Sequence, residues 1–480
     1  MNMRWSPETH SGRPQPRINP TFWLTLFVLA ACFLLGGASR KNVWQASTLV
    51  ILALPLLAWS LWRLLERGTW RQVKLPLAIL AFAGLVPLVQ LLPLPFDLWA
   101  TLPGRAGPAE ALRLAGPPNW IAFSLTPDGT IRGLLYLIPP IALFLGVVDL
   151  NIRERRFLLL AVPLAATFSL GLGALQVFAG EGSIFYLYGS LNSDSAPGLF
   201  ANRNHQATLF VCSITLIGAW IATRSGPARS RMLSNVLAIA ILMLMILGLT
   251  VVKSRAGILL LGPAVLACLL LLWAGERAER RTRVLAIALL GLGAGMFLSL
   301  FALHPLLERF ISEPGEGQRA AVIISTFRTG LDYLPFGSGL GGFVPIYAGI
   351  EPIGQIGPAF WNHAHNDYAE LWLETGLFGL AGLGLFVVWW ISSVRHALRT
   401  RPEGELEIWA GAIVTLLILT HSAVDYPLRA LALAAVFALA CGLMTPSLDV
   451  RPSDPSRVRV KVRKGLPASS DLPQAIADSV

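Results

Sequence analysis

The chain has 480 residues, of which 54% are hydrophobic and 14% are charged, and it carries a net charge of +11. Soluble domains average about 25% charged residues, so this chain has too few charges to cover a water-facing surface of its length. The composition excludes soluble multidomain, disordered and nucleic-acid-binding proteins. It predicts an all-α, polytopic integral membrane protein.

Residues 1–20 form a polar, Pro-rich N-terminal segment. The apolar run that follows is long enough to span a bilayer, so this segment does not resemble a cleaved signal peptide. Each of the four cysteines stands inside an apolar run without a close partner. This pattern indicates small buried hydrophobic residues, and it shows neither a disulfide framework nor zinc-ligand spacing.

A bilayer core requires about 20 apolar residues per helix, and residues 21–446 offer twelve candidate spans. They are 21–38, 43–62, 75–93, 130–149, 157–179, 205–223, 234–252, 257–274, 284–303, 368–391, 408–424 and 428–446. Pro139 and Pro140 interrupt the fourth span and predict a kinked helix. The last two spans are short and are separated by a tight turn. We therefore expect a membrane domain of about twelve helices.

The basic residues predict the orientation of these spans. With the N-terminus in the cytoplasm, each of the seven cytoplasmic segments holds at least three Lys or Arg residues, 26 of the 38 in total. This positive-inside pattern places both termini in the cytoplasm. Three outer segments are long, 94–129, 180–204 and 304–367, and the last joins spans nine and ten. Residues 447–480 are basic with little apolar content, which predicts a disordered cytoplasmic tail.

Ionisable residues within or beside the spans concentrate on the outer side. They are Arg203, His205, Lys253, Arg255, His363, His365, Asp367, Glu370, Glu374, His421, Asp425 and Arg429. Such residues are costly in hydrocarbon and therefore mark candidate functional sites. The planar guanidinium of Arg suits phosphate, and His suits proton abstraction near neutral pH. The set predicts an outer-face site for an anionic, phosphate-bearing substrate.

Several motifs show a resemblance. His365-Asn366 is followed, after nine residues, by Gly376-Leu-Phe-Gly379, with Leu380 where Thr or Val is usual. The other motifs are Ser124-Leu-Thr-Pro127, Phe200-Ala-Asn-Arg-Asn204, Ser254-Arg-Ala-Gly257, Pro335-Phe-Gly-Ser-Gly-Leu340 and His421-Ser-Ala-Val-Asp-Tyr426. In this order, from about residue 90 to 430, the chain resembles the O-antigen ligase and O-antigen polymerase superfamily of bacterial membrane glycosyltransferases.

The resemblance implies a reaction and its partners. Family members transfer a glycan from an undecaprenyl-diphosphate carrier to an acceptor hydroxyl at the outer face of the inner membrane. They use no nucleotide sugar and require no metal, so we expect no cofactor. Ligases use lipid A-core as the acceptor, whereas polymerases use another carrier-linked repeat. A flippase and a chain-length regulator are possible partners, and direct displacement by one base predicts inversion at the anomeric carbon.

The resemblance also assigns roles to residues of this chain. His365 matches the proposed general base, and Arg203 and Arg255 match the arginines that bind the diphosphate. Lys253 stands beside Arg255 and is interpreted as a helper or as a contact to lipid headgroups. The expected supporting residues are His363, Asn366, Asp367, Glu370, Glu374, Gly376 and Gly379. We predict no metal ligands, because the two-residue spacing of His363 and His365 alone does not make a zinc site.

Several alternatives stay open from the sequence. Glu370 and Glu374 share a helical face with Asp367. They either orient His365 or an arginine, or they balance the charge of Arg203, Arg255 or Arg429. His421, Asp425 and Arg429 are interpreted as a structural polar network. The ligase is the leading hypothesis, a polymerase of O-antigen or exopolysaccharide repeats is the alternative, and a protein-glycosylating ligase is a third. A lipid-linked glycan transporter is the rival from another class.

Overall fold

A computed structural model describes residues 19–38, 44–180, 182–188, 196–224, 227–275, 315–353, 356, 360–402 and 404–447. Residues 1–18 of the predicted N-terminal segment lie outside this part of the chain. So do the ninth predicted span, 284–303, the first residues of the loop 304–367, and the predicted tail from residue 448 onward.

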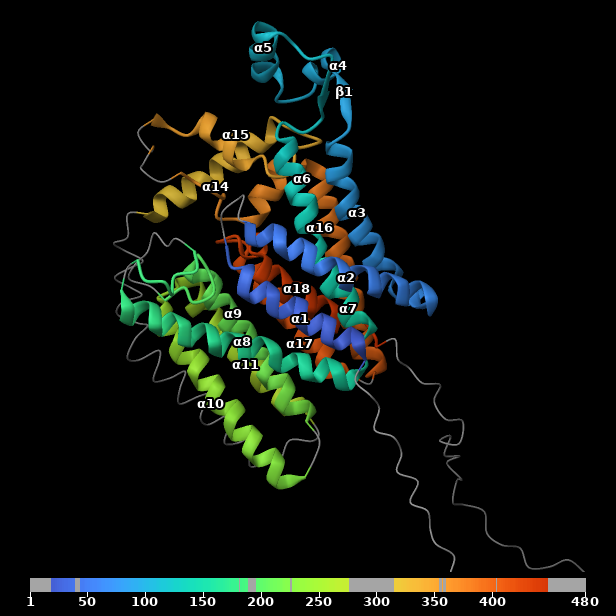
Figure 1. The fold of residues 1–480 in the computed structure, drawn as a ribbon, viewed down its shortest axis with the longest axis vertical. Helices are drawn as coiled ribbons and strands as arrows, with labels where there is room; N and C mark the ends of the chain where they lie inside the picture. The colour runs from blue at the N-terminus through green and yellow to red at the C-terminus, as the bar shows by residue number, and fades with distance from the viewer. Residues whose placement is uncertain are drawn as a thin grey trace, which may run out of the picture. The chain divides into compact units, whose positions relative to one another are not determined.

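The described residues form helices and one short strand pair (Figure 1). In chain order the elements are α1 (Pro20–Leu35), α2 (Trp44–Glu66), η1 (Thr69–Val73), α3 (Lys74–Gln90), β1 (Pro93–Pro95), α4 (Phe96–Ala100), α5 (Ala106–Ala115), β2 (Trp120–Ala122), α6 (Pro127–Tyr136), α7 (Ile138–Asp149), α8 (Ile152–Ala179), α9 (Arg203–Thr223), α10 (Ala228–Val252), α11 (Arg255–Ala274), α14 (Gly315–Leu331), α15 (Phe343–Ile350), α16 (Asp367–Thr400), α17 (Glu405–His421), η4 (Pro427–Arg429) and α18 (Leu431–Leu443).

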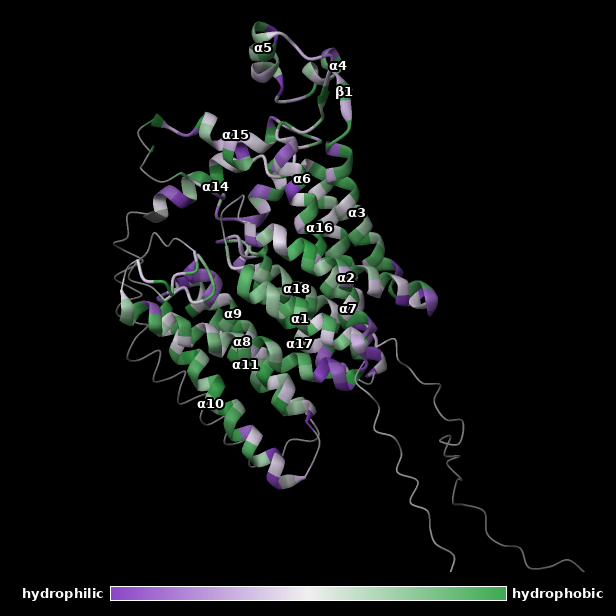
Figure 2. Ribbon diagram, in the orientation of Figure 1, coloured by the Kyte–Doolittle hydropathy of each residue, from purple (hydrophilic) through white to green (hydrophobic). Residues whose placement is uncertain are grey.

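Eight helical segments of the described residues are long and apolar enough to cross a bilayer, and α1 and α18 are shorter apolar helices. Figure 2 shows hydrophobic residues along the bodies of these helices and hydrophilic residues gathered near their ends. The chain is therefore a mostly helical, multi-pass membrane protein. A helix occupies each predicted span that falls within the described residues, and the count of twelve stays a prediction.

The predicted interruption of the fourth span is confirmed. α6 ends at Tyr136 and α7 begins at Ile138, with a turn at Leu137 between them. Pro139 and Pro140 stand in the first turn of α7, where the N–H that proline lacks has no helical partner to lose. The two prolines therefore mark the start of a second helix within this span.

α9 lies at the centre of one group of helices and packs against α8, α10, α11 and α17. Nearly all of its residues are buried. Its hydroxyl side chains, including Thr208, Ser213 and Thr223, donate to carbonyl groups one turn earlier in the same helix. Polar groups without water must be satisfied internally, so these bonds let a polar helix remain buried.

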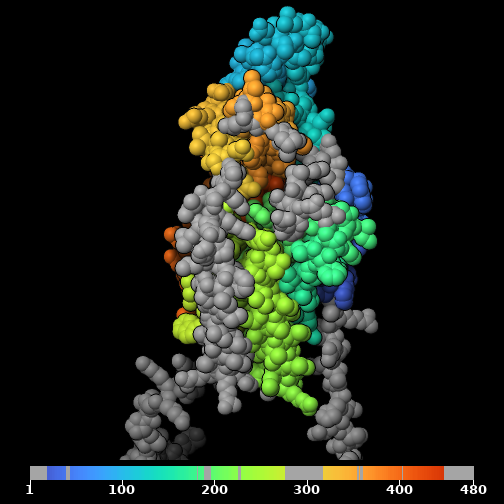
Figure 3. Space-filling view, turned by 90° about the vertical axis from the view of Figure 1, so that its left-hand side faces the viewer, coloured from blue at the N-terminus to red at the C-terminus, as the bar shows by residue number. Residues whose placement is uncertain are grey.

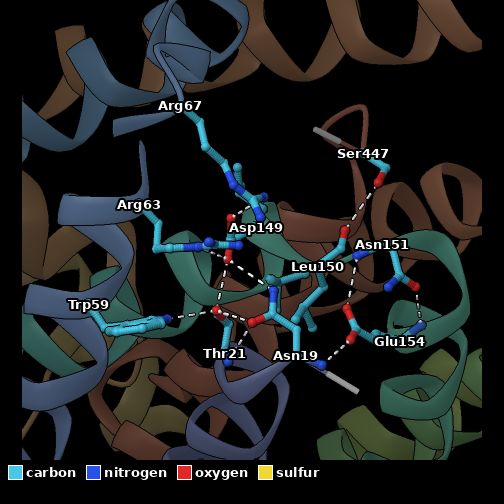
Figure 4. Close-up of polar contacts among 12 residues, drawn as sticks. Asn19, Thr21, Trp59, Arg63, Arg67, Asp149, Leu150, Asn151, Glu154 and Ser447 are labelled. Atoms are coloured by element: carbon cyan, nitrogen blue, oxygen red, sulfur yellow. Dashed lines mark hydrogen bonds and ion pairs between the residues drawn. The ribbon is translucent and has the colours of Figure 1, made fainter. Parts of the chain in front are cut away.

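α1, α2, α7 and α18 form a second group, and polar contacts tie three of their ends together (Figure 4). The carboxylate of Asp149 at the end of α7 accepts from Arg67 at 2.9 Å and from Thr21 at 2.8 Å. Trp59 of α2 donates its indole N–H to the hydroxyl of Thr21 at 2.9 Å. These contacts fix the starts and ends of α1, α2 and α7 relative to one another.

At the opposite end of the helices lies a small region built from β1, α4, α5 and β2 (Figure 1). β1 pairs antiparallel with β2, with Leu94 opposite Ile121. Figure 3 shows these cyan residues next to the yellow and orange residues of α14 to α16. Arg105 joins the two parts, because its guanidinium lies 5.5 Å from the ring centre of Trp99 and 5.6 Å from that of Tyr333.

Candidate active site

His365 lies in the turn before α16, where its backbone adopts a left-handed conformation with φ of 52°. This conformation is uncommon for residues other than glycine. The side chain is 12% exposed, and its Nδ1 lies 3.2 Å from Oδ1 of Asp425, which is fully buried. The ring of Trp361 stands edge-on against it, with centroids 5.6 Å apart. The turn therefore aims His365 at a buried acid from another part of the chain.

Asp425 collects hydrogen bonds from several segments. Its Oδ2 accepts from the amides of Asn204 at 2.7 Å and Asn202 at 3.1 Å, and its Oδ1 accepts from the backbone N–H of Tyr426. Burial alone would raise the pKa of Asp425. The hydrogen bond from His365 and the neighbouring imidazoles lower this pKa by more than burial raises it, so it lies well below its usual value. Asp425 is therefore a carboxylate.

A carboxylate at this position decides the tautomer of His365. Asp425 has no proton to donate, so Nδ1 of His365 must carry the hydrogen of the 3.2 Å contact. In the neutral ring the other nitrogen, Nε2, then has a free lone pair. His365 is thereby arranged to accept a proton from a bound molecule.

The same network reaches the two candidate diphosphate-binding arginines. Ser254 donates its hydroxyl to the amide oxygen of Asn204 at 2.8 Å. Asn202 and Ser254 cap the N-termini of α9 and α11, so Arg203 and Arg255 are the first residues of two adjoining helices. Helix N-termini carry partial positive charge and favour anions. Positive charge therefore gathers on the Asn204 side of Asp425.

Lys253 occupies the C-cap of α10 in a left-handed conformation, with φ of 55°. Its side chain is exposed. Only Ser254 separates Lys253 from Arg255, the first residue of α11.

A second polar cluster surrounds Arg429. Its guanidinium lies 2.9 Å from a carboxylate oxygen of Glu374, 3.3 Å from Glu370 and 3.5 Å from Asp367. Glu370 also accepts from Nδ1 of His363 at 2.9 Å. The acidic face of α16 thus lies against Arg429, one of the arginines expected from the sequence, and Glu370 also contacts His363. The described carboxylate partner of His365 is Asp425 instead.

Tyr426 connects the two clusters. The centre of its ring lies 4.3 Å from that of His363, 5.0 Å from that of His365 and 5.1 Å from that of His205. Three imidazoles therefore surround one phenol ring next to Asp425. A shift of the Tyr426 ring would therefore change the packing of each of these histidines.

The glycine motif is a break in α16. Gly376 has φ of 57° and ψ of −137°, which interrupts the helix. The loop 335–340 packs against the break: Leu377 donates its N–H to the carbonyl of Pro335 at 3.0 Å, and Gly339 donates to that of Glu374 at 3.0 Å. Asn366 caps the start of the helix through the N–H of Ala369. Two sequence motifs thus meet to hold the acidic turn of α16.

Gly379, the second glycine of this motif, follows one turn later. A Cβ at this position would lie 2.8 Å from Cγ of Leu371 and would also meet the hydroxyl of Thr375. Its small size therefore allows close packing of side chains along the first turn after the break.

A cavity of about 340 Å³ opens beside these clusters. Its polar lining comes from His363, Asp367, Tyr368 and Arg429, and from Arg132 of α6. The remaining lining is largely apolar. The cavity is therefore suited to a molecule with both polar and hydrocarbon parts.

Residues 238–384 match the sequence model of the O-antigen ligase family. The match begins within α10 and ends within α16, so it includes Arg255, His365 and both motif glycines. This match over residues 238–384 supports the O-antigen ligase and polymerase superfamily for the chain. The resemblance stated from the motifs is thereby confirmed. No curated protein matches the chain.

The family is one of glycosyltransferase-like enzymes, and it indicates an O-antigen ligase-like or polymerase-like function. It implies a lipid-linked glycan and an acceptor as substrates, in contact with membrane lipids. Neither the family match nor the fold assigns a role to any single residue. The geometry of the site supplies the arguments for those roles.

The structure divides the expected polar network of His421, Asp425 and Arg429. Pro427 starts η4, so the three residues do not share one helix face. Asp425 contacts His365, Arg429 contacts the acids of α16, and Nδ1 of His421 contacts the hydroxyl of Thr208. The sequence contained a signal for Asp425, because it stands in one of the family motifs. Neither its contact with His365 nor the lining position of Arg132 could be read from the sequence.

Proposed function

We propose that this protein is an O-antigen ligase-like glycosyltransferase of the bacterial inner membrane. It moves a glycan from an undecaprenyl-diphosphate carrier to an acceptor hydroxyl, that of lipid A-core, at the periplasmic face. One observation carries the proposal: hydrogen bonds run from His365 through Asp425 and Asn204 to Ser254. They connect the proposed base to the helix ends that bear Arg203 and Arg255.

In the proposed reaction, Nε2 of His365 takes the proton of the acceptor hydroxyl. The acceptor oxygen forms a bond to the anomeric carbon while the bond from that carbon to the diphosphate oxygen breaks. The bond electrons leave with the carrier diphosphate, whose growing negative charge is stabilised by Arg203 and Arg255. Asp425 stabilises the imidazolium that forms. A single displacement inverts the anomeric carbon.

The arginines supply the positive charge that Mg²⁺ supplies in many diphosphate reactions, so we propose a reaction without a metal. Lys253 adds charge beside Arg255, and the helix N-termini of α9 and α11 add their dipoles. The acidic turn of α16, held by Asn366, Gly376 and Gly379, positions His363 and Arg429. In this arrangement both termini are cytoplasmic and the loop 304–367 is periplasmic.

The same donor chemistry serves a polymerase, in which the acceptor is a second carrier-linked repeat. The family includes both activities, and the proposed base and arginines would act identically. The two functions differ in the acceptor, so the acceptor must be tested directly.

The first experiment mixes purified protein with an undecaprenyl-diphosphate oligosaccharide, EDTA, and either lipid A-core or the carrier-linked repeat. Wild type is compared with H365A, R255A and D425N. We expect one added band on lipid A-core, and a loss of about 100-fold or more in H365A, because general-base catalysis contributes about 10²–10⁴-fold. A ladder of longer carrier-linked glycans would assign the polymerase instead.

Two exposed residues of α16 provide matched controls. His396 and Arg399 lie at the other end of the helix, so H396A and R399A should transfer glycan at the wild-type rate. Unchanged turnover in H365A would reject the proposed base, whichever acceptor works. Activity that requires added metal would reject the role given to the arginines.

A further inference from the structure

Two glutamines that take no part in the proposed reaction stand at the ends of membrane helices. Gln90 is the last residue of α3, and Gln176 lies in the last turn of α8. They are 3% and 0% exposed, respectively. A buried amide is costly unless its oxygen and nitrogen are hydrogen-bonded. The partners of the two side chains therefore indicate what each glutamine does.

Gln176 pairs with both polar groups of one backbone residue. Its Oε1 accepts from the N–H of Gly198 at 2.8 Å, and its Nε2 donates to the carbonyl of Gly198 at 2.8 Å and to that of Phe185 at 2.9 Å. Residues 196–200 are buried and lie outside the helices, so their backbone groups need partners from other segments. Gln176 supplies these partners to Gly198.

A second side chain of α8 reinforces this attachment. Ser169 lies about two turns before Gln176 on the same face of the helix, and its hydroxyl accepts from the N–H of Leu199 at 2.9 Å. Gly198 has φ of 59°, and a Cβ there would lie 2.4 Å from the hydroxyl oxygen of Ser169. The segment therefore fits closely against α8, directly before residues 202–204.

Gln90 makes the corresponding pair of bonds at the second polar cluster. Its Oε1 accepts from the N–H of Leu340 at 2.9 Å, and its Nε2 donates to the carbonyl of Glu374 at 2.9 Å. Leu340 ends the loop 335–340, and Glu374 precedes the break of α16 at Gly376. Gln90 therefore attaches both this loop and the acidic turn of α16 to the end of α3.

We propose that Gln90 and Gln176 are positioning residues for glycan transfer, each of which holds one half of the site through backbone hydrogen bonds. The proposal rests on the proposed function and adds two residues that lie outside its reacting groups. Gln176 fixes the segment that leads to residues 202–204, whose amides contact Asp425 and which include Arg203. Gln90 fixes the acidic turn that surrounds the second cluster.

The chemistry of the amide explains why glutamine occupies both places. An amide side chain offers an acceptor oxygen and two donor N–H groups, so one side chain can satisfy a backbone N–H and a backbone carbonyl together. Leucine has a similar volume but can satisfy neither group. Replacement by leucine would leave buried backbone groups without partners, at a cost that corresponds to about 5- to 150-fold in an equilibrium constant.

Hydrogen–deuterium exchange of the full chain in detergent, read by mass spectrometry, measures the two attachments without turnover. Q176L should speed exchange about 10-fold in peptides that cover residues 196–204 and leave the loop 335–340 unchanged. Q90L should have the opposite effect on the two segments. Equal exchange in wild type and Q176L, or faster exchange in both segments from either variant, would overturn the proposal.

The transfer assay tests positioning through a double-mutant cycle with N204A. We expect Q176L and Q90L each to lower kcat/KM about 10-fold. Q176L acts through the segment that leads to Asn204, so it should cost about 3-fold or less in N204A, whereas Q90L should keep its full cost there. The same cost of Q176L in wild type and in N204A would reject the positioning role.

T415V is the matched control. It removes a buried hydrogen bond of 3.0 Å between the indole N–H of Trp390 on α16 and the hydroxyl of Thr415 on α17. We expect T415V to lower the melting temperature and to leave kcat/KM and the exchange of both segments unchanged. A loss of transfer in T415V equal to that in Q176L would show that any loss of stability lowers activity, and would reject the proposal.

Failure of the proposed function would give a different result. If wild type transfers no glycan to either acceptor, while Q176L and Q90L each speed exchange in their own segment, the two attachments stand and the assigned activity fails. If wild type transfers glycan and H365A does not, but exchange in Q176L equals that of wild type, the positioning role alone fails.

Discussion

At the scale of single residues, Asp425 organises the site. It is fully buried and accepts hydrogen bonds from Asn202, Asn204, His365 and the backbone of Tyr426. A buried carboxylate is costly unless its oxygens are satisfied. The same bonds that satisfy Asp425 also align His365 and join the ends of α9 and α17, so this residue serves both structure and chemistry.

The lowered pKa of Asp425 predicts how stability depends on pH. A carboxyl whose pKa is lower in the folded than in the unfolded chain stabilises the fold above its unfolded pKa, about 3.9, and loses that contribution as the pH falls through the folded value. We expect D425N to melt several degrees below wild type at pH 7, and the gap to narrow below about pH 4. Thermal unfolding in detergent at several pH values measures this gap.

D332N provides the comparison, because Asp332 is an exposed acid directly after α14. It should follow wild type across the same pH range. A difference in melting temperature between D425N and wild type that stays constant down to low pH would show that Asp425 stabilises the fold through its shape and not through its charge.

At the scale of elements, α16 combines two tasks on either side of a break. Before Gly376 it carries the acids that hold His363 and Arg429, and after Gly376 it continues as an apolar membrane helix. The loop 335–340 fills the break with backbone hydrogen bonds. The break therefore joins the polar turn before Gly376 to the membrane helix after it. The loop 335–340 fixes the angle between the two parts.

G376A tests this role. A Cβ at Gly376 would lie 2.4 Å from the carbonyl oxygen of Pro335 and 2.8 Å from the nitrogen of Gly337, and both are backbone atoms. With the added cost of a left-handed conformation, of about 1–3 kcal/mol, we expect a lower melting temperature and loss of transfer. Thermal unfolding and the transfer assay measure the two effects.

The matched control is G384A on the same helix, where a Cβ meets nothing within 4 Å. Alanine has the higher helix propensity, so G384A should be as stable as wild type or more stable. Equal stability of G376A and G384A would show that the break tolerates a side chain.

The sequence predicted helices better than it predicted contacts. Runs of about 20 apolar residues suffice to locate a span, because every helix in a bilayer meets the same requirement. Gly376 was recognised from its spacing to His365. By contrast, Asp425 lies 60 residues after His365 and 221 after Asn204. Only the packing of α17 against both α9 and α16 brings the three residues together. Arg132 gave no motif signal at all.

At the scale of the whole molecule, the four cysteines are all buried in the described bundle, which makes the orientation testable without removing them. L114C lies in α5 and T400C at the far end of α16, both at exposed positions. The positive-inside pattern predicts that a membrane-impermeant maleimide labels L114C in intact spheroplasts and labels T400C only after lysis.

Wild type provides the background for this experiment and should remain unlabelled. Labelling of T400C in intact spheroplasts, with L114C protected until lysis, would show that the orientation is opposite to the predicted one. The site would then face the cytoplasm. That outcome would exclude lipid A-core as the acceptor at the periplasmic face.

The network from Ser254 to His365 also sets an order for biosynthesis. Ser254, Asn204 and their helices are translated well before Asp425, which follows Arg255 by roughly 10–35 s at the usual rates of synthesis. Until then Asn202 and Asn204 lack the carboxylate that they contact in the finished protein. A nascent chain that stops before Asp425 would contain most of its membrane helices and both arginines, and yet lack the carboxylate that His365 contacts. If His365 is the base, the protein can therefore become active only after the segment that follows α17 has been made.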